Sequence, residues 1–150
     1  MEERKKACTF FGHADAPIEA RHVLEGIVRD LIENKGVSVF YIGRHGSFDI
    51  GANLLLDRLQ REEYPHIEHF LVLSYLPTKK SEYDRYDHSL LPDGIETVPP
   101  KFAILYRNQW MIEHSDYVLT YVTHGWGGAA KAKRLAERKK KVVINLPDLT

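Results

Sequence analysis

Short apolar segments alternate with segments of helical spacing along almost the whole chain, and this alternation limits the fold more than any other feature. The apolar segments are continuous, which is typical of strands buried on both faces of a sheet. They span residues 7–11, 37–42, 69–75, 117–122 and 142–146. Amphipathic helices are predicted between them, at about 17–33, 48–63, 101–114 and 127–140. The sequence therefore predicts an α/β fold with one Rossmann-like, doubly wound and mostly parallel five-stranded sheet, covered by helices on both faces.

The length of the chain, 150 residues, matches the size of one domain, and no internal repeat or low-complexity segment divides it. Residues 1–150 are therefore expected to form a single domain. The segment 76–100 is polar and contains several prolines, and it is long for a connection within a compact domain. Connections of this length often serve function, so the segment is a candidate lid over a ligand.

Charge and cysteine content narrow the function classes. Lys and Arg together number 21, as do Asp and Glu, so the net charge is zero and a large nucleic-acid interface is not expected. Basic residues do recur at 131, 133, 134 and 138–141, but a solvated helix face explains them more simply than a nucleic-acid patch. The one cysteine, Cys8, lies in an apolar segment and is interpreted as a small buried residue rather than a nucleophile.

The sequence shows neither a signal peptide nor an apolar segment of membrane-spanning length. A single cysteine also suits a reducing compartment. A cytoplasmic protein without membrane association is therefore expected.

Glycine is concentrated immediately after three of the predicted strands. The segments concerned are Gly12–Asp15, Gly43–Asp49 and Thr123–Gly128. In open parallel sheets, ligands bind outside the carboxyl ends of the strands, where glycine lets the backbone approach a ligand and a following helix offers N–H donors to anions. These segments predict a phosphate site, although the glycines could simply turn the chain. Neither the G-x-G-x-x-G nor the Walker pattern is present.

Histidines accompany the glycines at the same three strand ends. His13, His45 and His124 could meet at one rim and hold zinc with an open position for water. Alternatively, each is a polar loop residue with its own hydrogen bonds or a contact to phosphate, and this alternative is favoured because no ligand spacing links them. The other histidines are expected on the surface or on helix faces. They are His22, His66, His69, His88 and His114.

The segment Arg107–Met111 contains a second group of candidate residues. Arg107 and Asn108 could contact a phosphate and a base or ribose. By chemistry alone, a solvated Arg107 with Trp110 or Met111 in the core is somewhat favoured over this ligand-binding role.

The ordered motifs together resemble the SLOG superfamily, the Rossmann-like lineage that includes DNA-processing protein A and the LONELY GUY enzymes. The resemblance covers about residues 7–146 and is closest to small bacterial SLOG proteins of unknown function. The motifs that carry it are Phe10-Phe11-Gly12-His13, Arg107-Asn108, Met111, Ser115-Asp116, Gly127-Gly128 and Ala136. The resemblance implies a nucleotide ligand at the strand edge, with phosphate at the glycine loop after the fourth strand. Relatives are often dimers, so a homodimer is an expectation of the same kind.

The chain also departs from the pattern of the LONELY GUY enzymes. Those enzymes use a glutamate to cleave an N-glycosidic bond, and Ala130 or Lys131 occupies its position here. Ala129 and Ala14 likewise replace the expected threonine and arginine. Asp15 and Asp49 are the remaining carboxylates that could serve as catalytic residues.

The sequence therefore predicts a nucleotide-binding or nucleotide-sensing protein, without a certain cofactor. A nucleoside 5′-monophosphate N-glycosidase is the first alternative, and a nucleic-acid or protein-partner module is the second. The residues expected to contact the ligand are Gly12, His13, Gly43, Arg44, Gly46, Arg107, Asn108, His124, Gly125, Gly127 and Gly128.

Overall fold

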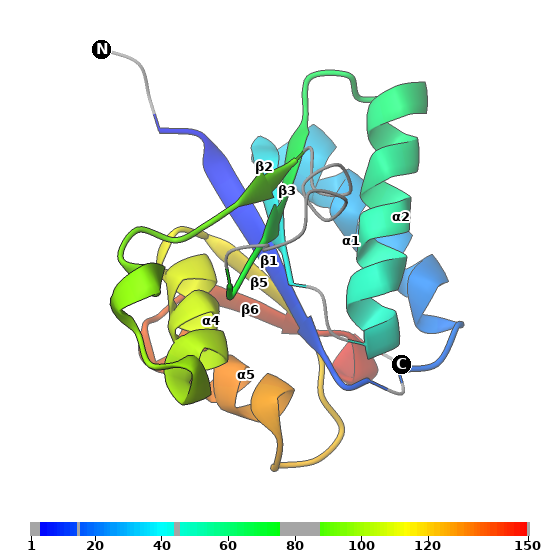
Figure 1. Cartoon of the computed structure of the whole chain (residues 1–150). Helices are drawn as coiled ribbons and strands as arrows, with labels where there is room; N and C mark the ends of the chain where they lie inside the picture. The colour runs from blue at the N-terminus through cyan, green and yellow to red at the C-terminus, as the bar shows by residue number, and fades with distance from the viewer. Residues whose placement is uncertain (1–3, 15, 44–45, 76–87, 150) are drawn as a thin grey trace.

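A computed structural model describes residues 4–14, 16–43, 46–75 and 88–149 (Figure 1). These residues form a six-stranded sheet in the order β4-β3-β2-β1-β5-β6, in which every pairing is parallel. The strands are β1 (Lys6–Gly12), β2 (Val37–Ile42), β3 (Glu68–Val72), β4 (Ser89–Leu90), β5 (Tyr117–Tyr121) and β6 (Val142–Asn145). The helices are α1 (Ala20–Lys35), α2 (Gly46–Glu62), α4 (Ala103–Glu113) and α5 (Gly128–Arg138). Three short 3₁₀ segments follow the same course, at Ile95–Thr97, Pro100–Phe102 and Leu146–Leu149.

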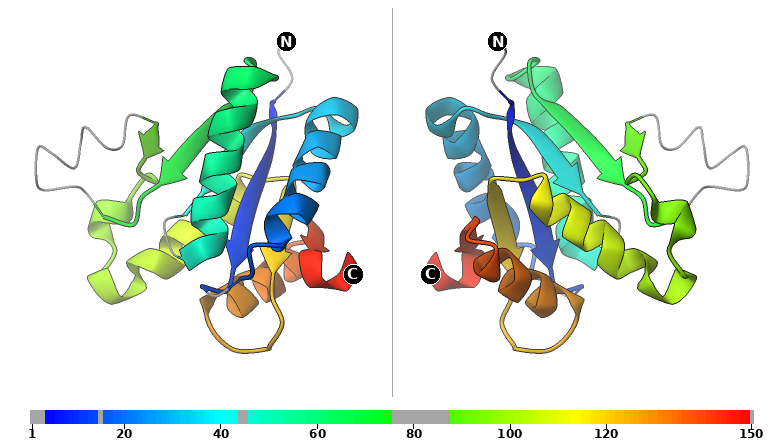
Figure 2. Two further views of the ribbon diagram at one scale, coloured as in Figure 1. Left: turned by 90° about the vertical axis from the view of Figure 1, so that its right-hand side faces the viewer. Right: turned by 90° about the vertical axis from the view of Figure 1, so that its left-hand side faces the viewer.

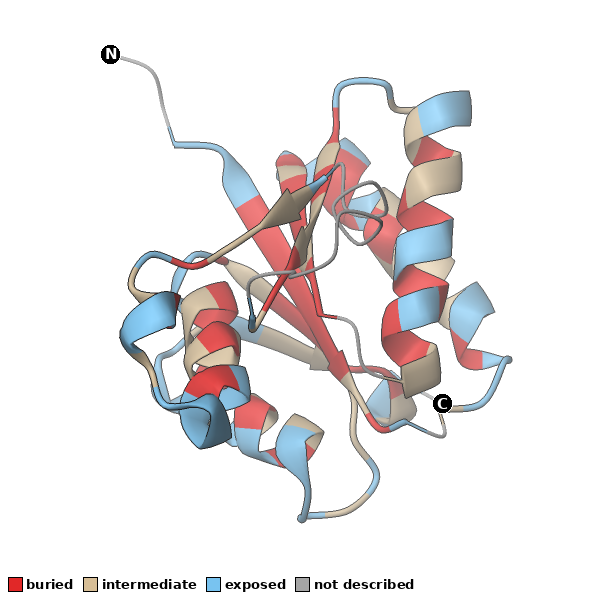
Figure 3. Cartoon of the chain, viewed as in Figure 1, coloured by how far each residue is buried: buried red, intermediate tan, exposed pale blue. Residues whose placement is uncertain are grey.

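The helices cover both faces of the sheet, α1 and α2 on one side and α4 and α5 on the other (Figures 1 and 2). Successive residues of a strand point to opposite faces. Phe10 accordingly packs with Leu24 of α1 and Leu56 of α2, whereas Phe11 packs in a second core with Met111 of α4. The central strands β1 and β2 are mostly buried between these two helical layers, whereas the outer strands β3, β4 and β6 are largely half-buried (Figure 3). The prediction of a doubly wound, Rossmann-like α/β fold is confirmed.

The sheet has one strand more than predicted. Ser89 and Leu90, expected within the connection 76–100, pair with Leu71 and Val72 as a sixth strand at the edge. Two residues form no apolar segment that a sequence pattern could reveal, so only tertiary pairing defines them. The connection also contains the 3₁₀ segments around Ile95–Thr97 and Pro100–Phe102, after which α4 begins at Ala103. Residues 76–87, the main part of the candidate lid, lie outside the described residues.

Several burial predictions are wrong. The helical spacing of Ile50, Leu54, Leu55 and Leu59 predicts that all four face the sheet, but Ile50 and Leu54 are 54% and 56% exposed. The side of α2 that is buried includes Phe48, Ala52 and Leu55. Ile18, predicted by its spacing to belong to the first helix, precedes α1 and is exposed. His69, expected at the surface, is buried in β3, where desolvation lowers its pKa.

Cys8 is fully buried in β1, as predicted, and burial raises the pKa of its thiol. A thiol of that kind remains protonated at neutral pH and is a poor nucleophile. In the described part of the chain, no helix combines the length and the apolar character that a bilayer span requires.

The order of connections creates a crevice at one place along the carboxyl edge of the sheet. The chain runs outward from β1 through β2, β3 and β4, then returns to β5 on the other side of β1. The connections from β1 and β5 therefore leave on opposite faces, through α1 and α5. Such a topological switch point is where open α/β sheets bind ligands.

Candidate functional site

A cavity of about 550 Å³ opens at this switch point. We call it the switch-point pocket. The loops after β1 and β5 form two of its sides, and residues from α2, α4 and α5 complete it. Its lining residues are Phe11, Gly12, His13, Ala14, Asp49, Ile104, Arg107, Asn108, His124, Trp126, Gly127, Gly128 and Ala129. The structure therefore brings together residues that the sequence analysis singled out in four separate segments.

The glycine loop after β5 leads into the N-terminus of α5. Gly127 precedes the helix with φ 93°, a left-handed conformation that favours glycine, and no side chain caps the first turn. A Cβ atom on Gly125, Gly127 or Gly128 would meet nothing within 4 Å, so the loop faces open space. The Arg134 guanidinium of α5 donates a hydrogen bond to the carbonyl of Gly125 at 2.8 Å and so restrains the loop. The exposed N–H groups and the helix dipole favour an anion here.

Arg107 enters the switch-point pocket from α4 and is only 4% exposed, so the interpretation as a solvated helix residue is wrong. Its Nε and one terminal nitrogen donate hydrogen bonds to the Asn108 side-chain oxygen at 3.2 and 2.9 Å. Burial lowers the pKa of Arg107, and the nearby carboxylate of Asp49 opposes that effect. An arginine remains cationic under such a shift. The pocket therefore contains a buried positive charge beside a helix N-terminus.

Three rings form a continuous stack at the rim of the pocket. His13 lies on His124 with 3.7 Å between ring centroids, and His124 lies on Trp126 with 3.6 Å. The backbone N–H of Thr123 donates to Nε2 of His13 at 3.0 Å, which requires that nitrogen to be unprotonated. Trp126, at the outer end of the stack, is 70% exposed. Its free face offers a flat surface for another ring.

The stack bears on the three-histidine metal hypothesis. Imidazole lone pairs lie in the ring plane, and the planes of His13 and His124 are only 10° from parallel. Two rings stacked in this way cannot both direct a lone pair at one ion. His45 lies outside the described residues, and among those described no cluster of three potential metal ligands occurs.

The glycines at the carboxyl ends of β1 and β2 have close neighbours that leave little or no room for a side chain. A Cβ atom on Gly12 would lie 2.4 Å from Cγ of Phe48, so α2 can pack against β1 only at glycine. A Cβ atom on Gly43 would lie 3.3 Å from both Arg107 and Asp49, so glycine leaves room for these two charged side chains. Gly46 has φ 85°, and a Cβ atom there would lie 2.7 Å from Cα of Ala14. Gly43, Gly46 and Gly125 do not line the pocket, while Asp15 and Arg44 lie outside the described residues.

Ser115 and Asp116, which belong to the motifs that resemble the SLOG superfamily, lie at the opposite, amino edge of the sheet. Asp116 accepts a hydrogen bond from the backbone N–H of Ala7 at 3.0 Å, and its own N–H donates to the Ala7 carbonyl at 2.8 Å. This exchange fixes the starts of β1 and β5. Asp116 therefore has a structural role in this chain.

Five lining residues were not among the predicted ligand contacts or catalytic candidates, namely Phe11, Ala14, Ile104, Trp126 and Ala129. Trp126 stands within the glycine loop beside His124, and a tryptophan in such a loop is a signal that could have been used. Ile104 carries no signal of its own, because it reaches the pocket only through the placement of α4.

Comparison with known proteins supports the fold. The structure of DNA processing protein A from Streptococcus pneumoniae matches with a TM-score of 0.68 and 15% identity, covering 93% of this chain and 49% of that one. DNA processing protein A from Helicobacter pylori, in a structure describing its single-stranded DNA binding mode, matches with a TM-score of 0.60 and 19% identity, covering 92% and 63%. At these identities the likeness establishes a shared Rossmann-like fold.

Sequence similarity to known proteins is weak. No family model matches the chain. The ABC transporter ATP-binding protein YtrB of Bacillus subtilis is 25% identical over 107 residues, which are 63% of this chain and 35% of that protein. The chain thus spans less than two thirds of each of these proteins, and it contains no Gly-Lys pair with which a Walker motif could be built.

Proposed function

We propose that the chain is a nucleotide-binding or nucleotide-sensing protein of the SLOG type, with its ligand in the switch-point pocket. The observation that carries this proposal is the buried Arg107 facing the same cavity as the uncapped N-terminus of α5. A guanidinium and a row of backbone N–H groups form a complementary pair of donors for a phosphate. The Gly127–Gly128 backbone has no side chain that would keep a phosphate away.

The ring stack supports a nucleotide over inorganic phosphate. The outer face of Trp126 is exposed and lies on the rim of the same cavity. A base stacking there would extend the series His13, His124, Trp126 by one ring. Base–aromatic stacking contributes about 1–3 kcal/mol and tolerates any base, so affinity for several nucleotides is expected.

Calorimetry with nucleoside mono-, di- and triphosphates, and with the parent nucleosides, tests this function. Nucleotides should bind and nucleosides should bind much more weakly, because the phosphate contacts are lost. The Arg107→Met variant should weaken nucleotide binding about a hundredfold, which corresponds to about 2.7 kcal/mol. Arg107→Lys, which keeps the charge, should recover part of the affinity.

The matched control is Arg61→Met, at an exposed position of α2 far from the pocket. Circular dichroism of each variant separates loss of binding from loss of fold. Equal affinity for adenosine and AMP, or no loss in Arg107→Met, would contradict the phosphate site.

Hydrolysis of a nucleoside monophosphate is a second candidate function, because Asp49 is the one acidic side chain among the described residues that line the pocket. Asp49 lies in the first turn of α2, close enough to Arg107 for their charges to interact. Chromatography of released base would detect the reaction. Base release that disappears in Asp49→Asn but persists in Asp57→Asn, a partly exposed position of the same helix outside the pocket, would favour the hydrolase.

A further inference from the structure

A second hollow, of about 610 Å³, lies between α4 and α5 on the open side of these helices. We call it the α4/α5 groove. Its floor is aliphatic and includes Ile104, Leu105, Ala132 and Leu135. Ile104 and Leu105 are 48% and 49% exposed, although both are large apolar residues. Figure 2 shows α4 and α5 side by side on this face of the sheet, with no other helix or strand of the described residues over them.

The rim of the groove is strongly basic. Lys101, Lys131, Arg134 and Arg138 line it, and no carboxylate from the described part of the chain does. Within the described chain none of these four cations forms an ion pair, whereas Lys133 and Lys139 nearby pair with Glu137 and Glu113. In a chain whose net charge is zero, this is a local excess of positive charge around exposed apolar surface. Such a combination is typical of a surface that binds an acidic and partly apolar partner.

We propose that the α4/α5 groove binds an acidic amphipathic helix of a partner protein. Two neighbouring helices present a groove into which a third helix can place apolar side chains at positions i, i+3, i+4 and i+7. Its flanking glutamates and aspartates would meet the four cations of the rim. This proposal does not depend on the nucleotide function, since the groove is a separate hollow that shares only Ile104, Asn108 and Gly128 with the switch-point pocket.

Two other occupants fit the groove less well. A second copy of the chain, related by a two-fold axis at this surface, would bring the same cations face to face. Single-stranded nucleic acid prefers exposed aromatic platforms, but the floor here is aliphatic. The one aromatic residue of the groove, Phe102, has the ammonium group of Lys101 over its ring at 5.1 Å.

Fluorescence anisotropy with the full chain tests the proposal. The probe is a labelled helical peptide of about 18 residues, with leucine at the i, i+3, i+4 and i+7 positions and glutamate at most others. Three comparison probes are a scrambled peptide of the same composition, a peptide with lysine for each glutamate, and a thymidine oligonucleotide of similar charge. The acidic amphipathic peptide should bind at least about tenfold more tightly than each of them, and its affinity should decrease with salt.

Variants then locate the site. Leu105→Asp should weaken peptide binding about tenfold or more, and Lys131→Glu and Arg138→Glu should each weaken it several-fold at low salt. The matched controls are Leu54→Asp and Arg61→Glu, at exposed positions on α2, which should change affinity less than about twofold. Circular dichroism verifies the fold of every variant.

Four results would overturn the proposal. They are no binding of the acidic amphipathic peptide, equal binding of the scrambled peptide, tighter binding of the oligonucleotide, and Leu105→Asp without effect. A wild-type dimer that Leu105→Asp converts to a monomer would assign the groove to a second copy instead.

Discussion

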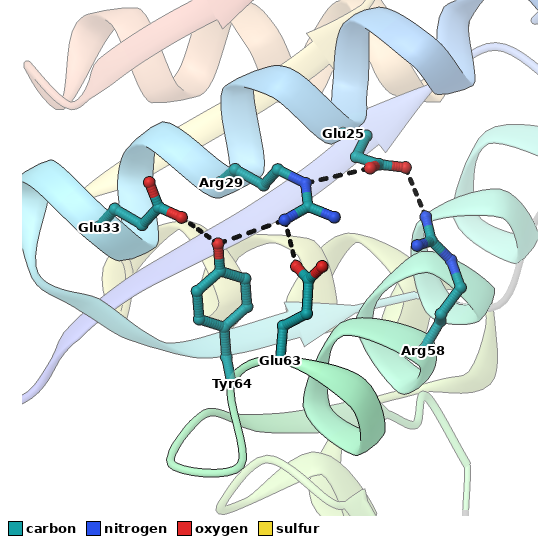
Figure 4. Close-up of polar contacts among 6 residues, drawn as sticks. All are labelled: Glu25, Arg29, Glu33, Arg58, Glu63 and Tyr64. Carbon is teal, nitrogen blue, oxygen red and sulfur yellow. Dashed lines mark hydrogen bonds and ion pairs between the residues drawn. The ribbon is translucent and has the colours of Figure 1, made fainter.

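The two helical faces of the sheet differ in how their charges are satisfied. On the α1/α2 face, Arg29 pairs with Glu25 and Glu63, Arg58 pairs with Glu25, and Tyr64 donates to Glu33, so one polar network joins the two helices (Figure 4). On the α4/α5 face, four groove cations have no such partner among the described residues.

This difference separates structure from function in the molecule. The α1/α2 face contains the larger of the two cores, and several of its charged side chains form ion pairs with one another. Both features are typical of a layer that stabilises the fold. The α4/α5 face supplies Arg107, the N-terminus of α5 and the basic groove. Substitutions on the first face should therefore change folding, and substitutions on the second should change binding.

The largest effect is expected at Gly12, where β1 packs against α2 on the α1/α2 face. Gly12→Val should destabilise the fold by about 3 kcal/mol, because any Cβ atom there overlaps Phe48 of α2. Gly128→Ala, with open space around it, should change stability by less than about 0.5 kcal/mol but weaken nucleotide binding. Urea unfolding and calorimetry measure the two quantities. Comparable destabilisation by both substitutions would remove the distinction between packing glycines and loop glycines.

Trp126→Ala should give the opposite result from Gly12→Val. Nucleotide binding should weaken by about 1–2 kcal/mol, since the outer ring of the stack is lost. Stability should hardly change, because Trp126 is 70% exposed. Trp126→Phe is the control and should retain most of the affinity. Unchanged binding in Trp126→Ala would show that the base does not stack there.

Arg29→Met tests the polar network of the α1/α2 face. Its loss should reduce the free energy of unfolding by about 1 kcal/mol, with a smaller difference at high salt, because the ion pairs are partly exposed. Arg138→Met, on the α4/α5 face, should leave stability unchanged. Chemical denaturation at two salt concentrations provides the measurement. A larger loss in Arg138→Met than in Arg29→Met would reverse the assignment of the two faces.

The smallest effect is a dependence of stability on pH. Burial, and secondarily the charge of His88, lowers the pKa of His69 in the folded chain. The unfolded chain therefore takes up a proton first, near the ordinary histidine pKa of about 6.5, and stability decreases as the pH falls through that value. Melting temperatures from pH 8 to pH 5 should show this decrease. His69→Phe should flatten the curve, and an equally steep curve in that variant would exclude His69 as the source.

Much of the fold could be predicted because local chemistry and tertiary packing agree in it. Val37–Ile42 is β-branched and aromatic, is bounded by glycine at both ends, and forms a strand with the predicted limits. The stripe of α2 was misassigned because Ile50 and Leu54 have the same spacing as residues that are buried. Spacing alone does not reveal which side of an amphipathic helix meets the sheet.

The site divides in the same way. The sequence by itself determined the glycine loop, the order of strands and helices, and therefore the edge at which a ligand site can form, since these follow from backbone conformation and periodicity. Only the tertiary structure decided that Arg107 is buried in the pocket, that Gly12 leaves room for the ring of Phe48, and that His13, His124 and Trp126 stack. Those relations join segments separated by many residues, and the energies of burial and contact that define them exist only after the chain has folded.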